Sequence, residues 1–317
     1  MSSWEWIKTK LASDDVFSLV VPLGSASGGP VLAGTMNGLY SSTDSGQSWR
    51  PMTEDMGAFP VTSVACAPGY PKDPTIIVGG PQGVVLRSVD GGGDWLLSRL
   101  GFPDVAVTVL AISPSFSRDG LVLAGTAEDG IYRSTTRGRL WAPVNFGLLD
   151  LRVWDLILSP AWETDQTAFA VAGDSLFRTT NGARAWKDIG ADLEGVVPQS
   201  AVTSPDFGRD GTVLLGTEGD GVWRSLDRGD SWEPAPDTRL TAVDCLAVSS
   251  ACDTGYSLYA GTAENGILCS RDGGESWVRL GGEDWPAVLS LVEVTGEEGR
   301  VLLAAVHGEG VFRLRRR

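Results

Sequence analysis

Short apolar runs alternate along the whole chain with turns rich in Gly, Asp and Ser. One example is the run 121–126, followed by an acidic turn at 127–130 and a second run at 131–134. β-Branched and aromatic residues on either side of a tight Gly-containing turn are typical of β-hairpins. A further apolar run precedes each hairpin. The pattern therefore predicts an all-β chain of short antiparallel strands.

A tryptophan follows the hairpin at a nearly constant interval of 45 or 46 residues, at Trp49, Trp95, Trp141, Trp186, Trp232 and Trp277. Regular periods of about 20–50 residues indicate repeat architectures such as solenoids and propellers. With its extra apolar run, each period holds four short strands. Four strands in a repeat of this length predict one blade of a β-propeller.

The eight residues that end at each tryptophan form a second repeated motif. Four copies read Ser-x-Asp-x-Gly-x-x-Trp, with the acidic position at Asp44, Asp90, Asp227 and Asp272. The other two copies have Thr136 and Asn181 there. Asp and Ser side chains bond to nearby backbone N–H groups, and Gly adopts positive φ without steric cost. We call this motif the aspartate turn and expect it, with its tryptophan, to be structural.

The aspartate turn resembles the Asp box, or BNR repeat. The chain is similar over nearly its whole length to Asp-box propellers, which include sialidases, sortilin-type receptor ectodomains, xyloglucan-degrading enzymes and photosystem II assembly factors. The resemblance implies a propeller with its binding face opposite the aspartate turns. It does not imply an activity, because one fold hosts many functions.

Although the chain has only six aspartate turns, the sequence predicts seven blades. After Trp277 three further strands are expected, at 288–294, 300–305 and 310–313, and no fourth follows. Trp4 lies 45 residues before Trp49, so we expect residues 3–11 to supply the outer strand of the last blade. Such closure removes an exposed sheet edge. Residues 1–317 are thus predicted to form one seven-bladed domain of four-stranded antiparallel blades.

The composition narrows the range of partners. A formal net charge of −15 argues against nucleic acid and anionic membranes and suits a basic or cationic partner. Four cysteines without metal or disulfide spacing and one histidine give no reason to expect a metal or another cofactor. The chain has no membrane-spanning apolar run and no signal peptide. We therefore expect a soluble monomer, cytoplasmic if Met1 is the native start and secreted otherwise.

Candidate binding residues are found where the repeats differ. Aligned on the tryptophan interval, the first strands begin at Phe17, Thr62, Thr108, Trp154, Gln199, Asp244 and Leu289. Their successors are Ser18, Ser63, Val109, Asp155, Ser200, Cys245 and Ser290. Trp154, Asp155, Gln199 and Asp244 break the pattern of small or apolar residues. We expect them at the mouth of the central channel, where they bind a partner or merely pack locally.

The turns between second and third strands are acidic in several repeats. They contain Glu128, Asp129, Glu218, Asp220, Glu264, His307 and Glu309. An acidic rim would attract a cationic ligand or a Lys/Arg-rich segment, whereas ordinary solvated loops are the alternative. His307 with Glu309 would give a pH-sensitive contact.

The sequence does not decide whether the protein is an enzyme. Sialidases clamp the substrate carboxylate with three arginines, and this chain lacks the Arg-Ile-Pro segment of that family. Its repeated arginines recur beside the aspartate turn and are interpreted as structural: Arg87, Arg133, Arg178, Arg224 and Arg313. Blades of nearly equal length favour a non-enzymatic binding or scaffold protein for a protein, peptide or small ligand, with no catalytic residue. A glycoside hydrolase that uses Asp155 and Asp244 is the alternative.

Overall fold

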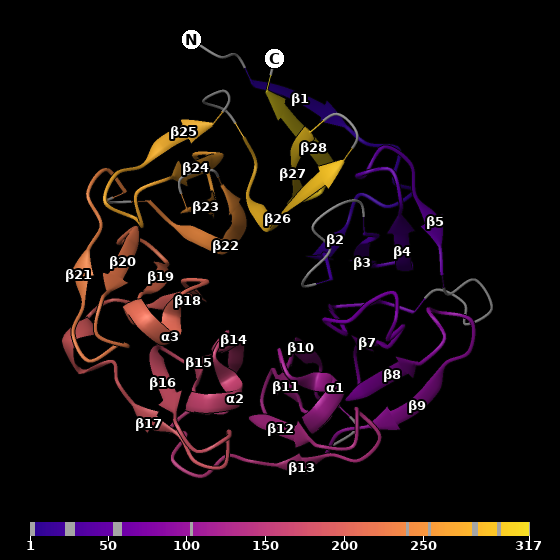
Figure 1. The fold of residues 1–317 in the computed structure, drawn as a ribbon, viewed down its shortest axis with the longest axis horizontal. Coiled ribbons are helices and arrows are strands. Elements are labelled where there is room, and N and C mark those ends of the chain that lie inside the picture. Colours follow the sequence, from indigo (N-terminus) through magenta and orange to yellow (C-terminus); the bar gives the residue numbers. More distant parts are fainter. Residues whose placement is uncertain are drawn as a thin grey trace.

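The computed structural model describes residues 4–22, 29–52, 59–101, 104–238, 241–252, 255–280, 285–296 and 299–316. Within these residues, seven four-stranded antiparallel sheets are arranged radially around a central channel (Figure 1). The predicted seven-bladed β-propeller is confirmed.

The strands of each blade are given from the channel outward. Blade 1 contains β2 (Val16–Val20), β3 (Val31–Thr35), β4 (Gly38–Ser42) and β5 (Arg50–Pro51). Blade 2 contains β6 (Ser63–Cys66), β7 (Ile76–Gly79), β8 (Val84–Ser88) and β9 (Leu96–Arg99). Blade 3 contains β10 (Val107–Ile112), β11 (Val122–Thr126), β12 (Ile131–Ser134) and β13 (Ala142–Pro143). Blade 4 contains β14 (Val153–Leu158), β15 (Ala168–Ala172), β16 (Ser175–Thr179) and β17 (Lys187–Asp188).

The remaining three blades follow the same order. Blade 5 contains β18 (Pro198–Thr203), β19 (Val213–Thr217), β20 (Val222–Ser225) and β21 (Glu233–Pro234). Blade 6 contains β22 (Val243–Cys252), β23 (Gly255–Thr262), β24 (Ile267–Ser270) and β25 (Val278–Leu280). Blade 7 contains β26 (Val288–Gly296), β27 (Gly299–Val306), β28 (Gly310–Arg316) and β1 (Trp4–Lys8).

Blade 7 joins the two ends of the chain. β1 runs antiparallel to β28 from the pair Trp4 and Arg316 to the pair Lys8 and Phe312. The expected outer strand is therefore present, although it is shorter than the predicted range 3–11. Beneath it, the rings of Trp6 and Trp285 lie 4.0 Å apart between centroids. Hydrogen bonding and aromatic packing together hold this closing strand.

Three short helices were not predicted. α1 (Phe116–Asp119), α2 (Trp162–Asp165) and α3 (Phe207–Asp210) connect the first and second strands of blades 3, 4 and 5, and a 3₁₀ turn, η2 (Ala191–Leu193), precedes blade 5. At each of the three α-helices a serine hydroxyl donates to the aspartate six residues later, for example from Ser113 to Asp119 at 2.7 Å. The spacing Ser-Pro-x-aromatic-x-x-Asp, which recurs in three repeats, was the available signal.

The aspartate turns have one geometry in all six copies. In the four complete copies the serine hydroxyl donates to the aspartate at 2.7 Å. The substitutes keep the acceptor, since Thr136 Oγ1 accepts the N–H of Leu140 at 2.8 Å and Asn181 Oδ1 accepts that of Ala185 at 3.1 Å. Hydrogen bonds headed by the one from the Ser231 hydroxyl lower the pKa of Asp227 to about 2. The carboxylate form is thus the one that holds the turn.

The hydrophobic core lies between blades rather than within them. Seven clusters of buried residues are found among the described residues, and each joins two neighbouring blades. The cluster between blades 3 and 4, for example, joins Leu123 and Ile131 to Phe177 and Trp186. The apolar side chains of each sheet are therefore buried against the neighbouring sheets.

A valine packed onto a glycine brings adjacent blades together near the channel. A Cβ atom added to Gly125 in β11 would lie 2.6 Å from Cγ1 of Val153, which begins the next blade. The same contact recurs in four other pairs: Gly34 with Val61, Gly79 with Val107, Gly216 with Val243 and Gly261 with Val288. Each valine thus fills the space that a side chain on the glycine would need.

We expect removal of residues 1–11 to destabilise the ring, because it exposes the edge of β28 and removes Trp6 from Trp285. The melting temperature should fall by at least about 5 °C, as measured by circular dichroism. Removal of residues 1–3 alone, which precede β1, is the control. An unchanged melting temperature in the longer deletion would contradict the closure.

We expect Gly125→Ala to destabilise the protein by about 1–3 kcal/mol, because the new Cβ overlaps Val153. Gly219→Ala is the matched control, since no atom lies within 4 Å of a Cβ added there. Urea denaturation of both variants measures the difference. Equal stability of the two variants would show that the contact is not limiting.

Candidate functional site

The first strands of all seven blades begin at one end of the channel and enclose a cavity of about 230 Å³ there. Every aligned first-strand position contributes to its lining: Phe17, Thr62, Thr108, Trp154, Gln199, Asp244 and Leu289. Asp155 lines it as well. The structure therefore brings Trp154, Asp155, Gln199 and Asp244 together as the alignment predicts. Their role in binding stays a prediction.

Two threonines at the aligned positions connect neighbouring blades. Thr62 Oγ1 donates to the carbonyl of Val107 and Thr108 Oγ1 to that of Val153, both at 2.5 Å. In contrast, Trp154, Gln199 and Asp244 have no side-chain hydrogen bond or ion pair to any described residue. The polar atoms of these three side chains are therefore not used by the described part of the blades.

Asp155 is held by the backbone of two blades. Oδ1 accepts the N–H of Leu156 at 2.8 Å, and Oδ2 accepts that of Ala201 in blade 5 at 3.0 Å. Burial in the channel wall raises the pKa of Asp155 to about 6, against the smaller effect of these two bonds. Burial also raises the pKa of Asp244. A positive charge near the channel mouth would therefore stabilise the ionised forms of both carboxyls.

Two serine hydroxyls add polar atoms to the cavity wall. Ser63 and Ser200 are 4% and 6% exposed, and their Oγ atoms have no hydrogen-bond partner within the described structure. Both residues line the cavity. Buried hydroxyls normally have hydrogen-bond partners. The hydroxyls of these two serines can therefore form hydrogen bonds with a ligand or with water.

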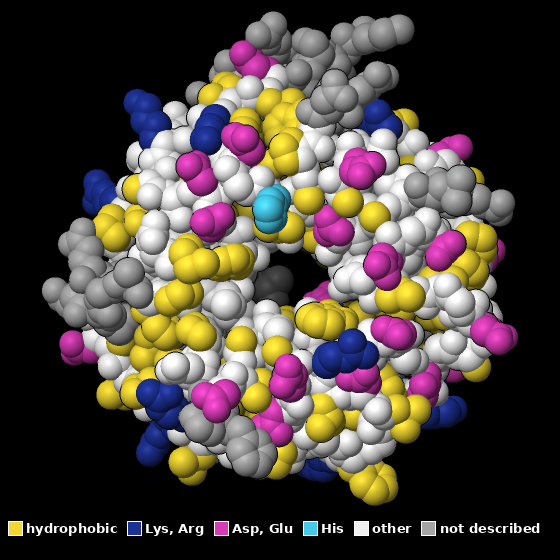
Figure 2. Space-filling model, turned by 180° about the vertical axis from the view of Figure 1, so that it is seen from behind, with side chains coloured by type: hydrophobic (Ala, Val, Ile, Leu, Met, Phe, Trp, Pro, Cys, Tyr) yellow, Lys and Arg dark blue, Asp and Glu magenta, His cyan; other side chains and the backbone are white. Residues whose placement is uncertain are grey.

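The acidic turns lie on the same face of the disc as this cavity. Thr126 at the end of β11 pairs with Val107 at the start of β10, so the turn that follows β11 is beside the channel mouth. Figure 2 shows this face, with Asp and Glu side chains spread around the opening and Lys and Arg mostly towards the rim. The aspartate turns follow the opposite ends of the third strands.

The predicted turn residues form a rim but do not line the cavity. Glu128, Glu218, Asp220, Glu264, His307 and Glu309 are exposed or partly exposed. Asp129 accepts the hydroxyl of Tyr132. Oε2 of Glu309 lies 3.7 Å from Nζ of Lys8, and this ion pair is exposed to solvent. A contact between His307 and Glu309 is not seen in the described residues, and their pH-sensitive role stays a hypothesis.

Exposed apolar side chains accompany the acidic ones on this face. Trp154 and Met36 are each 43% exposed, Leu151 is 38% and Phe17 is 36%. Leu151 is fixed there because its carbonyl accepts the N–H of Gly130 in the neighbouring acidic turn. The sequence did not single out Leu151 or Met36, because solvent exposure of one apolar residue leaves no periodic signal.

No group of three or more potential metal ligands is present in the part of the chain that the structure describes. Among the same residues, no helix is long and apolar enough to cross a membrane.

The comparisons with known proteins agree with the architecture. No protein-family model matches, and no curated protein matches. Among solved structures, YCF48 bound to D1 peptide is 17% identical with a TM-score of 0.70, covering 100% of this chain and 97% of that one. A GH74 xyloglucanase from Xanthomonas campestris is 18% identical with a TM-score of 0.72, covering 97% and 53%. The extracellular domain of BT4673 from B. thetaiotaomicron is 14% identical with a TM-score of 0.70, covering 98% and 39%.

At these identities the similarity shows the fold alone. This chain spans about 39% of the BT4673 domain and 53% of the xyloglucanase. The three proteins include a peptide complex and a glycoside hydrolase, so fold similarity does not choose between binding and hydrolysis. Membership of the Asp-box family likewise stays a prediction.

We expect the variant Asp155→Ser to change how stability depends on pH. The folded state raises the pKa of Asp155 from 3.8 to about 6, so protonation stabilises the fold as pH falls through this window. Serine removes the charge and keeps an acceptor, as Ser290 Oγ does for the N–H of Leu19 at 3.0 Å.

The free energy of unfolding of Asp155→Ser minus that of the wild type should therefore be about 2 kcal/mol larger at pH 7.5 than at pH 4.5. Urea denaturation at both pH values measures this difference. A difference that does not vary with pH would contradict the raised pKa.

Proposed function

We propose that this protein is a non-enzymatic binding platform that recognises a peptide segment of a partner protein at the channel mouth. The observation that carries the proposal is the set Trp154, Gln199 and Asp244. These side chains line one cavity and have no hydrogen-bond or ion-pair partner among the described residues.

The size of the cavity favours a peptide side chain over a whole small ligand. At about 230 Å³ it lies below the range of about 300–1,000 Å³ that is usual for small-molecule sites. One extended Lys or Arg side chain fits a space of this kind. The remainder of the peptide would then lie across the disc.

The electrostatics favour a cationic side chain. Asp244 and Asp155 line the cavity, and acidic turns surround its mouth. The indole of Trp154, 43% exposed, offers a face for a cation–π contact. The net charge of −15 would also steer a basic segment to the surface.

The exposed apolar residues support a protein partner. Met36, Leu151 and Phe17 lie on the mouth face with Trp154, and apolar anchors with charged surroundings are usual in protein recognition. The structurally similar YCF48 is described as bound to D1 peptide. That complex supports peptide binding as a use of this fold.

Glycoside hydrolysis by Asp155 and Asp244 is the second candidate, and the raised pKa of Asp155 favours it as a proton donor. Against it, both oxygens of Asp155 already accept backbone N–H groups. The cavity is also small for a sugar chain.

Peptides selected from a random phage-displayed library on the wild-type protein test the proposal. We expect the selected peptides to share a Lys or Arg next to apolar residues. Fluorescence anisotropy should show affinity at least about tenfold lower for Asp244→Asn and for Trp154→Ala. Asp174→Asn is the control, because Asp174 is an exposed turn residue outside the cavity lining.

Two outcomes would overturn the proposal. One is equal affinity of the wild type and both cavity variants for the selected peptides. The other is turnover of a glycoside substrate that Asp155→Asn abolishes.

A further inference from the structure

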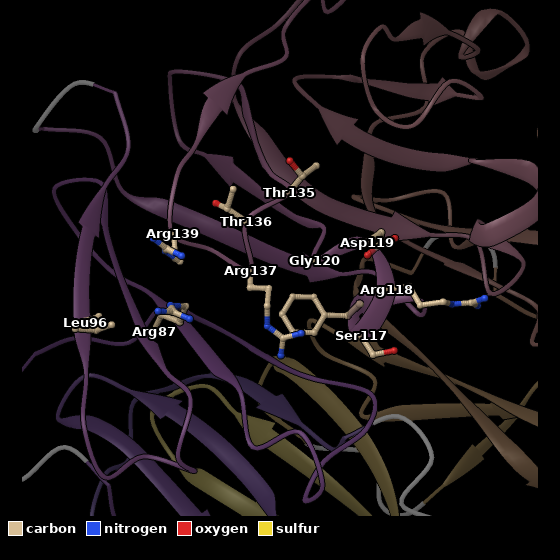
Figure 3. A pocket seen from close by; sticks show the side chains of 11 residues that line it. Arg87, Leu96, Ser117, Arg118, Asp119, Gly120, Thr135, Thr136, Arg137 and Arg139 are labelled. Carbon is tan, nitrogen blue, oxygen red and sulfur yellow. The ribbon is translucent and has the colours of Figure 1, made fainter.

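A second cavity lies on the opposite face, where blade 3 meets blade 2. It has a volume of about 690 Å³ and is lined by β8, α1 and the aspartate turn of blade 3 (Figure 3). Four arginines line it in a protein of net charge −15: Arg87, Arg118, Arg137 and Arg139. This basic cavity is unlike the acidic channel mouth.

The repeat explains why Arg87 is there. An arginine at this third-strand position reaches a backbone carbonyl in the aspartate turn of the next blade. Arg133 reaches Gly182, Arg178 reaches Arg228, Arg224 reaches Gly273 and Arg313 reaches Ser45. The interpretation of these four arginines as structural is confirmed by their contacts.

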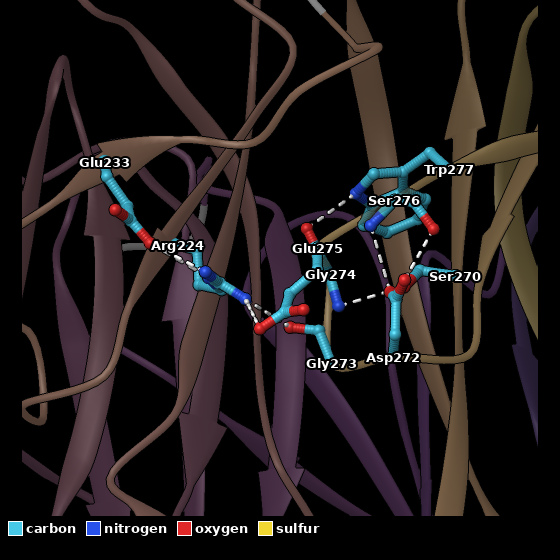
Figure 4. A network of polar contacts seen from close by, with 9 residues as sticks. All are labelled: Arg224, Glu233, Ser270, Asp272, Gly273, Gly274, Glu275, Ser276 and Trp277. Carbon is cyan, nitrogen blue, oxygen red and sulfur yellow. Dashed lines mark hydrogen bonds and ion pairs between the residues drawn. The ribbon is translucent and has the colours of Figure 1, made fainter.

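In two junctions an acidic residue of the next aspartate turn faces the arginine. Nη1 of Arg178 lies 2.9 Å from Oδ1 of Asp230. Nη1 of Arg224 lies 3.7 Å from Oε1 of Glu275, and its Nη2 lies 2.7 Å from Oε1 of Glu233. Figure 4 shows the second junction, with Arg224 between its two carboxylates and beside the turn from Ser270 to Trp277. The sixth residue of the turn thus supplies the neutralising charge.

The junction of Arg87 reverses this charge. The sixth residue of the turn in blade 3 is Arg139, at the position of Asp230 and Glu275. Arg87 is 9% exposed and has no hydrogen bond or ion pair to any residue that the structure describes. Burial, followed by the positive charges of Arg139 and Arg137, lowers the pKa of Arg87. Arg87 therefore lacks the carboxylate partner that Arg178 and Arg224 have.

The other charged groups of the cavity are already engaged. Arg137 pairs with Asp73 and lies over the ring of Phe116, 4.3 Å from its centroid, and Arg118 pairs with Glu163. The carboxylate of Asp119 accepts hydrogen bonds from Ser113, Leu121 and Trp162. The guanidinium N–H groups of Arg87 and Arg139, in contrast, make no hydrogen bond to any described residue.

The next junction shows that two arginines alone do not create such a site. There Arg133 faces Arg184, but Arg133 donates to the carbonyl of Gly182 and is close enough to Asp119 to feel its negative charge. The junction of Arg87 has neither compensation.

We propose that this cavity binds a phosphate group, as the free ion or at the end of a small molecule, through Arg87 and Arg139. A planar guanidinium offers paired donors that match phosphate oxygens. A doubly charged anion balances the two arginines, as a carboxylate balances Arg178 and Arg224 individually. Figure 3 shows Arg87 and Arg139 on the same side of the cavity, while Arg118 extends away from them.

The test measures melting temperature and calorimetric affinity with inorganic phosphate and with glycerol phosphate, at an ionic strength held constant with sodium chloride. The wild type should be stabilised by at least one of the two ligands and not by chloride. Arg139→Glu, which restores the acid found in blades 5 and 6, should bind at least tenfold more weakly. Without phosphate it should be no less stable than the wild type.

Arg184→Glu is the matched control at the same turn position of blade 4, and it should bind as the wild type does. Arg139→Gln, which copies Gln47 at this position of blade 1, replaces Arg139→Glu if that variant does not fold. Equal phosphate binding by the wild type and the Arg139 variant would overturn the proposal. So would the absence of any phosphate-dependent stabilisation of the wild type.

Discussion

The ring depends on a valine that begins a blade and packs onto the bare backbone of a glycine in the preceding blade, a contact found at five of the seven interfaces. The contact requires glycine in the second strand, because a Cβ atom there would lie less than 3.0 Å from the valine side chain. Two interfaces depart from it. In blade 7, β27 has Ala305 at the glycine position. In blade 4, β15 has Val171 there, and blade 5 begins with Pro198 instead of valine. Trp154, Asp155 and Gln199 lie at the interface of blades 4 and 5, so a change in packing and a change in surface chemistry coincide there.

Much of the architecture could be predicted because the repeat reports it many times. The tryptophan interval gave seven blades and the closing strand, and alignment on it placed Trp154, Gln199 and Asp244 at one mouth. What depends on contacts between repeats could not be predicted. Arg87 occupies the same repeat position as Arg178, so the repeat predicts the same structural role for both. The difference lies in residue 139 of the next blade, which meets Arg87 only in the folded ring.

The net charge of −15 conceals two faces of different character. Around the channel mouth, the acidic side chains lie on short hairpin turns, whereas the exposed Trp154 and Phe17 lie on the first strands β14 and β2. On the other face, the Ser and Asp side chains of the aspartate turns hydrogen bond within each turn, and Arg139 stands where blades 5 and 6 have an acidic residue. In both places the proposed sites lie where the chain deviates from the repeat, because the Ser and Asp side chains of the repeat already have hydrogen-bond partners.

The pairing of β1 with β28 has a topological consequence. In the other six blades an aspartate turn joins the third strand to the fourth, whereas in blade 7 these two strands come from opposite ends of the chain. The ring is therefore interrupted at one of seven equivalent positions. A linker with the aspartate-turn sequence between β28 and β1, with new ends at any other aspartate turn, would give a circular permutant that keeps the strand pairing of all seven blades. The position of the break is a property of the chain's connectivity and not of the packed ring.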